Sequence, residues 1–332
     1  MKKYNFKQSP LKVYGVNFDK NGNIYRLPQE IADKVNENTA KRTKNAVGGR
    51  VRFKTNSKVI EIGIKLASNK IDWAIPLSGS VGADVFVGVG TEAKRLGIIA
   101  PRDYETTEFS GKVKKSGENE TVTINLPRNE PVVDLWVAVE DGAEISEPDE
   151  YTLTTPIVFY GSSITEGGCA SAAGSAYTSI VSRWLDSDYI NLGFSNAAHG
   201  ELPTADYIAG LDMSVFVYDY DYNARDAEEL AATHEPFFKR IRKAQPDLPI
   251  IMISSSNFNN NPEVNAARRE VIKTTYNNAL ALGDKNVYFI DGEKIYEGYE
   301  HSLCTVERVH PNDLGFMLMA KAVYPVLKEI LK

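Results

Sequence analysis

The stretch VFYGSSITEGG, Val158–Gly168, decides how the second half of the chain folds. An apolar run ends abruptly in Gly-Ser-Ser, and small or polar residues follow it. A buried strand that stops at glycine and serine and continues as a helix is typical of the first βα unit of a parallel sheet. The stretch therefore predicts a strand–helix junction, and it raises the question whether Ser163 is a nucleophile.

Continuous apolar runs of the same kind recur downstream of this junction. Between them lie segments with helical spacing of apolar residues, such as the one from Tyr177 to Leu185. Thr233 is expected to cap a further helix with Pro236 in its first turn, and a last helix is expected to begin near Asn312. Alternation of buried strands and helices predicts a doubly wound α/β domain over residues 154–332. The apolar runs are PIVFY, YINL, SVFVY, PIIMIS and NVYFI.

The first 153 residues have a different pattern of apolar and polar residues. Short alternating runs are separated by Gly, Ser and Asn turns, and in RVRFKTNS the residues Val51 and Phe53 point one way while Arg50 and Arg52 point the other. This pattern is typical of a β-sandwich. We therefore expect a separate sandwich domain over residues 1–153, with one or two helical turns at PQEIADKVNEN.

Composition excludes several classes of function. The chain has 332 residues, a net charge of −6 and a pI near 5.5, so no strongly basic face for a nucleic acid is expected. No apolar run approaches the roughly 20 residues that span a bilayer. The start MKKYNFKQSP lacks the apolar core of a signal peptide, so a cytoplasmic location is expected, although a secreted chain that had lost its leader would look the same. The sequence leaves the oligomeric state open.

Neither a disulfide framework nor a metal site is expected. The two cysteines are Cys169 and Cys304, and no two of the four histidines have the spacing of zinc ligands. Because Cys169 follows the first loop and Cys304 precedes the last one, we expect two neighbouring thiols rather than a disulfide. No cofactor is expected.

Candidate catalytic residues follow the strands of the predicted parallel sheet. Because the carboxyl ends of parallel strands meet at one edge, Ser163, Asn196, Asn223, Glu307 and His310 should lie on the same edge of the sheet. Asp219 and Asp221 follow the third strand as well.

Each of these residues also has a structural interpretation. The serines could only cap a helix, Asn223 could be a turn residue, and His310 before Pro311 could be a core or capping histidine. No G-x-S-x-G motif is present, because Thr165 stands in place of the second glycine. His199 and His301 are interpreted as surface or loop groups.

In combination these segments resemble the SGNH hydrolases, also called the GDSL family of esterases and acylhydrolases. YGSSIT is similar to the first family block, with Ser162 in the aspartate place and Ser163 in the nucleophile place. NLGFSNA, DYDYNA and ERVHPNDLG are similar to the second, third and fifth blocks. GADVFV, Gly82–Val87, resembles the Gly-x-Asp-Leu-Tyr signature of β-sandwich domains that precede one bacterial subgroup of these esterases.

The resemblance implies a jelly-roll-like β-sandwich followed by a flavodoxin-like SGNH hydrolase domain. It implies ester hydrolysis without a metal, with Ser163 as nucleophile, His310 as base and Glu307 as the acid that orients the imidazole. The oxyanion hole would combine the backbone N–H groups of Ser163 and Asn196 with the side chain of Asn223.

By analogy the preferred substrate is a short-chain acyl ester, above all an acetyl ester, of a carbohydrate. The alternative is a weak or inactive relative that binds a carbohydrate or acyl ligand without turnover.

Two positions depart from the family pattern. Asn196 stands where the second block has glycine, and asparagine is among the better substitutes where φ is positive. Glu307 stands where the fifth block has aspartate, so the loop must retreat or the side chain must fold for the carboxylate to reach His310. Arg308 is placed to compete for that carboxylate.

Overall fold

The computed structural model describes residues 1–332, and the chain divides into two compact units. The sandwich unit comprises Met1–Arg26, Lys44–Thr154 and Cys169–Ile190. The α/β unit comprises Leu27–Thr43, Thr155–Gly168 and Asn191–Lys332. Each unit therefore takes in one segment from the other side of residue 154, and the two are described separately below.

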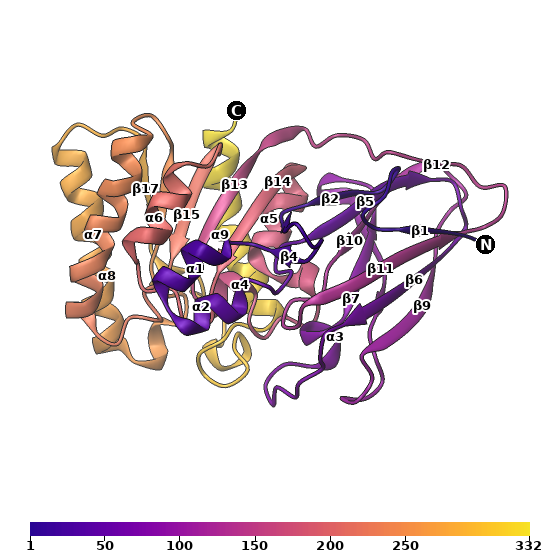
Figure 1. Cartoon of the computed structure of the whole chain (residues 1–332). Helices are drawn as coiled ribbons and strands as arrows, with labels where there is room; N and C mark the ends of the chain where they lie inside the picture. Colours follow the sequence, from indigo (N-terminus) through magenta and orange to yellow (C-terminus); the bar gives the residue numbers. More distant parts are fainter. The chain divides into compact units, whose positions relative to one another are not determined.

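The sandwich unit contains two antiparallel sheets. One has the strand order β1-β11-β6-β9, and the other has the order β12-β5-β10-β7-β8 with β2 paired to β5 (Figure 1). A small pair, β3 and β4, completes the strands. The strand bounds are β1 Lys2–Asn5, β2 Lys12–Tyr14, β3 Asn17–Phe18, β4 Ile24–Tyr25, β5 Arg50–Thr55, β6 Val59–Leu66, β7 Ala83–Val87, β8 Lys94–Ile99, β9 Glu108–Lys114, β10 Glu120–Asn125, β11 Val132–Val139 and β12 Ile145–Ser146.

The two sheets share one hydrophobic core, which confirms the predicted β-sandwich. Val51 and Phe53 of β5 are fully buried in the same cluster as Ile60 and Ile62 of β6. Their alternation along each strand places every second side chain between the sheets. Arg50 points the other way and is buried too, where its guanidinium forms an ion pair with Asp188.

The signature segment Gly82–Val87 fixes a loop of this unit. The Asp84 carboxylate is fully buried, accepts a hydrogen bond from Gly174 N–H at 3.0 Å and lies 3.2 Å from Arg95 Nε. Burial raises the pKa of Asp84, and the Arg95 charge opposes that rise. Asp84 is therefore a structural residue that ties β7 to the loop at Gly174.

A five-stranded sheet has the order β14-β13-β15-β16-β17, and β15, β16 and β17 lie entirely within the α/β unit. The neighbouring pairs from β13 to β17 are parallel. Numbered from β13, the order is 2-1-3-4-5, which is that of flavodoxin-like folds and confirms the predicted class. Its switch point lies at β13 and β15, so the site is expected where these strands end. The strands are β13 Leu153–Gly161, β14 Ser187–Gly193, β15 Val215–Asp219, β16 Ile250–Ile253 and β17 Val287–Ile290.

The helices agree with the predicted pattern except at one start. Asn312 caps the last helix as predicted, accepting hydrogen bonds from the N–H groups of Leu314 and Gly315. The prediction that Thr233 caps a helix is wrong, because Asp226 caps α7 and Pro236 lies inside it. No helix has the length and apolar character needed to cross a bilayer. The α-helices are α1 Gln29–Val35, α2 Glu37–Arg42, α3 Leu77–Ser80, α4 Ser163–Glu166, α5 Tyr177–Leu185, α6 Leu202–Ala209, α7 Ala227–Ala244, α8 Pro262–Ala281 and α9 Asp313–Ile330.

Aromatic rings pack α7 against the sheet. Phe237 of α7 stacks on Tyr160 of β13, with ring centroids 4.7 Å apart, and His234 stacks on Tyr218 of β15 at the same separation. His234 is buried, and its Nδ1 lies 2.8 Å from Thr275 Oγ1. Burial lowers the pKa of His234 to about 3, because the imidazolium would lose its hydration.

This burial makes folding sensitive to acid. Between pH 6.5 and about 3 the unfolded chain binds a proton at His234 and the folded chain does not, so stability falls as the pH drops through that window. The slope from one such group is about 1.4 kcal/mol per pH unit. We expect His234→Gln to remove that slope in urea unfolding measured at several pH values. An unchanged slope would show that other groups dominate acid unfolding.

Candidate active site

The nucleophile candidate lies at the junction of β13 and α4. Ser162 is buried and caps α4, since its Oγ accepts a hydrogen bond from Ile164 N–H at 3.2 Å. Ser163 is the first residue of α4 and is half-buried, so its hydroxyl remains accessible. The hydroxyl of Ser162 therefore caps the helix, whereas the hydroxyl of Ser163 is available for chemistry.

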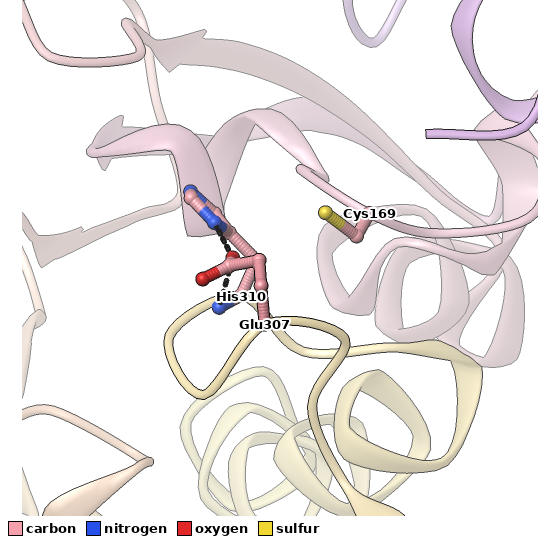
Figure 2. A group of neighbouring side chains, drawn as sticks. All are labelled: Cys169, Glu307 and His310. Atoms are coloured by element: carbon pink, nitrogen blue, oxygen red, sulfur yellow. Dashed lines mark hydrogen bonds and ion pairs between the residues drawn. The ribbon is translucent and has the colours of Figure 1, made fainter. Parts of the chain in front are cut away.

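Ser163, His310 and Glu307 form one hydrogen-bonded chain. Ser163 Oγ lies 2.7 Å from His310 Nε2. On the other side of the ring, Glu307 Oε1 contacts His310 Nδ1, and it also accepts the backbone N–H of His310 at 3.0 Å (Figure 2). With a proton on Nδ1, the ring donates to Glu307 and its Nε2 accepts from Ser163. This is the arrangement of a serine nucleophile with a base and an orienting acid.

The loop after Cys304 turns at Arg308, between Glu307 and His310. Arg308 has φ 75°, and its carbonyl accepts a hydrogen bond from Asn257 Nδ2. The carboxylate of Glu307 contacts His310 rather than Arg308. Gly168 leaves room for the ring, because a Cβ there would lie 3.1 Å from His310 Cδ2.

The candidate oxyanion loop follows β14. Asn196 has φ 51° and an exposed side chain, so asparagine adopts here the left-handed conformation that glycine takes most easily. The residue before it is held by Glu166, whose Oε2 accepts Ser195 N–H at 3.0 Å. Glu166 Oε2 also lies 3.9 Å from Arg42 Nη1 of α2.

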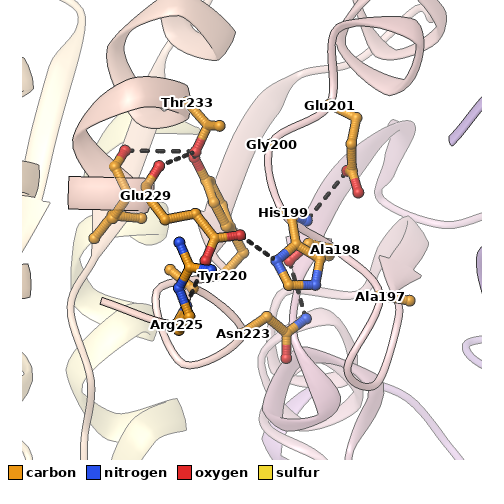
Figure 3. A network of polar contacts seen from close by, with 12 residues as sticks. Ala197, Ala198, His199, Gly200, Glu201, Tyr220, Asn223, Arg225, Glu229 and Thr233 are labelled. Carbon is orange, nitrogen blue, oxygen red and sulfur yellow. Dashed lines mark hydrogen bonds and ion pairs between the residues drawn. The ribbon is translucent and has the colours of Figure 1, made fainter. Parts of the chain in front are cut away.

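Asn223 lies beside this loop, as Figure 3 shows. Its Nδ2 donates to the carbonyl oxygens of Phe194 at 3.1 Å and Ala198 at 3.0 Å. Both N–H bonds of the amide thus have partners within the protein. Asn223 braces the loop on either side of Asn196, and it would have to share or exchange one of these bonds to donate to an oxyanion.

The loop is braced by two more residues that the sequence did not single out. Glu201 accepts hydrogen bonds from the hydroxyl of Tyr160 and from His199 N–H, each at 3.1 Å. Asn36 Nδ2 donates to Ala197 O at 2.9 Å, so the N-cap residue of α2 also holds the loop. These partners are far apart in the chain. Among the residues that hold the loop, only Glu166 could have been inferred from the sequence, because it lies one helical turn after Ser163.

The other polar residues near the ends of the strands form hydrogen bonds and packing contacts within the protein. The hydroxyl of Thr165 donates to Asp219, and Asp221 accepts from Ser255 N–H at 2.9 Å. His199 is half-buried, with Nδ1 3.2 Å from Glu229 Oε1 (Figure 3). His301 packs against the ring of Tyr296.

Both cysteines are buried free thiols. The Cys304 thiol lies 3.6 Å from Glu300 O, and burial raises its pKa. The absence of a disulfide was predicted, whereas the proximity of the two sulfurs remains a prediction.

Two family models together match most of the chain. A model of the GDSL-like Lipase/Acylhydrolase family matches residues 154–328. A model described as the N-terminus of Esterase_SGNH_hydro-type, named GxDLY, matches residues 1–145. No curated protein sequence matches.

Solved structures share the fold over nearly the full length. A GDSL-like lipase from Bacteroides ovatus is 25% identical with a TM-score of 0.88, covering 99% of this chain and 98% of that one. A salicylyl-acyltransferase, SsfX3, from a tetracycline biosynthetic pathway is 18% identical with a TM-score of 0.78, covering 99% and 97%. A family two carbohydrate esterase from Clostridium thermocellum is 15% identical with a TM-score of 0.65, covering 97% and 98%.

Proposed function

Because the chain belongs to the GDSL-like lipase/acylhydrolase family and is an ester hydrolase, we propose that it removes short acyl groups, above all acetyl, from a carbohydrate. We further propose that Ser163, His310 and Glu307 carry out the reaction. The observation that carries this proposal is the contact of 2.7 Å between Ser163 Oγ and His310 Nε2, with Glu307 on the opposite ring nitrogen.

Hydrolysis then proceeds in two halves. His310 Nε2 takes the proton of Ser163 as its oxygen attacks the ester carbonyl, and the protonated ring then passes that proton to the leaving sugar oxygen. In the second half His310 takes a proton from the water that attacks the acyl-serine, and it passes this proton to Ser163 Oγ as the carboxylic acid leaves. Glu307 keeps the proton on Nδ1 and stabilises the imidazolium in both halves.

The developing oxyanion requires donors at the start of α4. The backbone N–H of Ser163 lies in the first turn of α4, and the N–H of Asn196 and the amide of Asn223 supply the others in this proposal. The hydrogen bond that Ser195 N–H donates to Glu166 and the bonds that Asn223 donates to the loop hold this arrangement before substrate binds. The two backbone donors stabilise negative charge without reorganisation, whereas Asn223 must share or exchange one of its bonds to the loop.

The carbohydrate is inferred from structures that share the fold. The esterase from Clostridium thermocellum was solved in complex with cellohexaose, and an acetyl xylan esterase from Butyrivibrio proteoclasticus, 14% identical with a TM-score of 0.59, also shares the fold. These relatives act on or bind glycans, which supports a glycan ester as substrate here.

The expected result on model substrates is a preference for the shortest acyl chain. Release of p-nitrophenol from its acetate should exceed release from its octanoate, and an acetylated xylo-oligosaccharide should yield free acetate, with Ser163→Ala as the blank. Turnover of the p-nitrophenyl esters without release of acetate from the oligosaccharide would contradict the substrate class while leaving the mechanism intact.

Asn223→Ala is expected to lower kcat by about 10²-fold with KM nearly unchanged, because it removes one oxyanion donor. It should also lower the melting temperature, since two bonds to the loop are lost. Steady-state kinetics and thermal unfolding measure the two effects separately. A variant that changes only KM would remove Asn223 from the oxyanion hole.

The second candidate function is ligand binding with little or no turnover. The observation that favours it is the engagement of both Asn223 N–H bonds with carbonyl oxygens of the loop. If this holds, acetylated oligosaccharide binds in calorimetry, but neither it nor p-nitrophenyl acetate is hydrolysed faster than by Ser163→Ala.

A further inference from the structure

A small cavity of about 40 Å³ lies within the sandwich unit. All of its lining residues belong to that unit, and three of them are Arg52, Ser182 and Arg183. A water needs roughly 10–15 Å³ of such space, so the cavity has room for about three waters or one small anion. Nothing in the mechanism proposed above uses these residues.

Among the residues that line this cavity, Arg52 is unusual because its buried side chain lacks hydrogen-bond partners. Its side chain is 0% exposed, and none of its three guanidinium nitrogens has a hydrogen-bond partner in the protein. The guanidinium instead lies over two rings, 3.7 Å from the centroid of Tyr151 and 5.6 Å from that of Tyr14. Ring contacts use the faces of a guanidinium and leave its N–H bonds, which lie in its plane, without acceptors.

A second polar group in the same wall also lacks a partner. Ser182 Oγ is buried and has no hydrogen bond. A buried donor without an acceptor costs free energy, and the cost is larger when the donor is charged. Two such groups on one cavity point to a ligand that accepts hydrogen bonds from both.

The residues that line the cavity carry a net positive charge. Arg183 donates to Gly174 O at 3.0 Å, and although burial lowers its pKa to about 10, it remains protonated at neutral pH. Asp186 is the carboxylate among the lining residues, and its Oδ2 accepts from Thr152 N–H at 3.1 Å and Thr152 Oγ1 at 2.8 Å. The lining thus carries two guanidinium groups and one carboxylate that is already hydrogen-bonded, while Asp84 and Asp149, outside the lining, interact electrostatically with Arg183 and Arg52.

We propose that this cavity binds a carboxylate group. A carboxylate is planar, it accepts two parallel hydrogen bonds from the fork of Arg52, and its size suits the space. Ser182 Oγ donates a further bond. Two sources share this chemistry: a free small acid such as acetate, and the carboxylate of an acidic sugar whose ring stays outside the cavity.

Thermal unfolding and calorimetry of the full chain test the site. At constant ionic strength, sodium acetate should raise the melting temperature with saturation, by about 3 °C at high occupancy, whereas acetamide should not. Acetamide has the size of acetate without its charge. Equal effects of acetate and acetamide on the wild-type chain would overturn the proposal.

Two variants and a control locate the binding. Arg52→Gln should abolish the response to acetate, and Lys54→Gln, which removes a positive charge from the same strand, should keep it. If Arg52→Gln does not fold, Ser182→Ala decides, because loss of one hydrogen bond should weaken acetate binding by about 5–10-fold. Wild-type affinity in either folded variant of the cavity would overturn the proposal.

Sugar acids distinguish the two sources. Glucuronate binding more tightly than acetate, with glucose silent, identifies an acidic sugar as the ligand. Acetate binding without glucuronate binding identifies a free small acid. If neither binds to the wild-type chain, the proposal is wrong. These outcomes do not depend on ester hydrolysis, since no residue of the cavity belongs to the proposed catalytic set.

Discussion

Replacing Ser163 by alanine is expected to lower kcat by at least about 10³-fold while the melting temperature stays nearly unchanged. In the proposed mechanism the hydroxyl forms the acyl bond, and the hydrogen bond that the structure shows for this hydroxyl is the one to His310. Because Ser163 is half-buried at the first position of a helix, alanine fits there without strain. Hydrolysis of p-nitrophenyl acetate and thermal unfolding measure both effects.

Ser162→Ala is the matched control. Ser162 is buried and caps α4, so its loss should reduce stability by about 1 kcal/mol and leave kcat within a few-fold. The two neighbouring serines thus separate chemistry from folding. Equal loss of activity in both variants would mean that the junction matters as a whole, and the assignment of Ser163 would fail.

Glu307→Gln is expected to lower kcat by about 10²–10⁴-fold, because glutamine keeps the size of the side chain but removes its charge. Two effects combine. The imidazolium that forms in the transition state loses its counterion, and a glutamine that donates to Nδ1 through its amide favours the ring tautomer that cannot accept the proton of Ser163. The carboxylate contacts both His310 Nδ1 and the backbone N–H of His310, so it is well placed for this role.

The opposite result is informative as well. If His310 and Ser163 act as a dyad, Glu307→Gln should change kcat by less than a few-fold. Glu307→Asp probes the loop, because aspartate is one methylene shorter than glutamate and the turn at Arg308, with φ 75°, follows directly. Aspartate should therefore recover only part of the activity. Wild-type kcat in Glu307→Gln would remove the residue from the mechanism.

Much of the fold was predictable from local patterns. The apolar runs predicted the buried strands of the α/β unit, and the alternation in β5 predicted that Val51 and Phe53 face the sandwich core. The strand order of the parallel sheet followed from the family resemblance rather than from periodicity. One helix start was missed, because Asp226 provides a cap seven residues before Thr233 and the helix continues through Pro236. Rules for prolines at helix starts could not reveal that longer helix.

The sequence predicted which residues meet at the candidate site but not which residues hold them there. Ser163, Glu307 and His310 lie in motifs, and the structure brings them into one hydrogen-bonded chain. Ser195 N–H donates a hydrogen bond to Glu166, which lies 29 positions earlier in the chain. Asn36 donates one to Ala197 O, 161 positions later. No sequence-spacing rule predicts either contact. The sequence also could not predict that Asn223 donates hydrogen bonds to the carbonyl oxygens on either side of Asn196, because these bonds depend on the conformation of the loop.

The central claim is that Ser163 becomes acylated during turnover, and labelling with a fluorophosphonate tests it most directly. Such reagents phosphonylate a serine that a neighbouring base has activated, and tryptic mass spectrometry locates the adduct. The account predicts one adduct on Ser163, with loss of esterase activity in proportion to labelling, and no adduct in Ser163→Ala or after His310→Ala. Complete labelling at another residue with loss of activity, or full esterase activity in a chain quantitatively modified at Ser163, would contradict it.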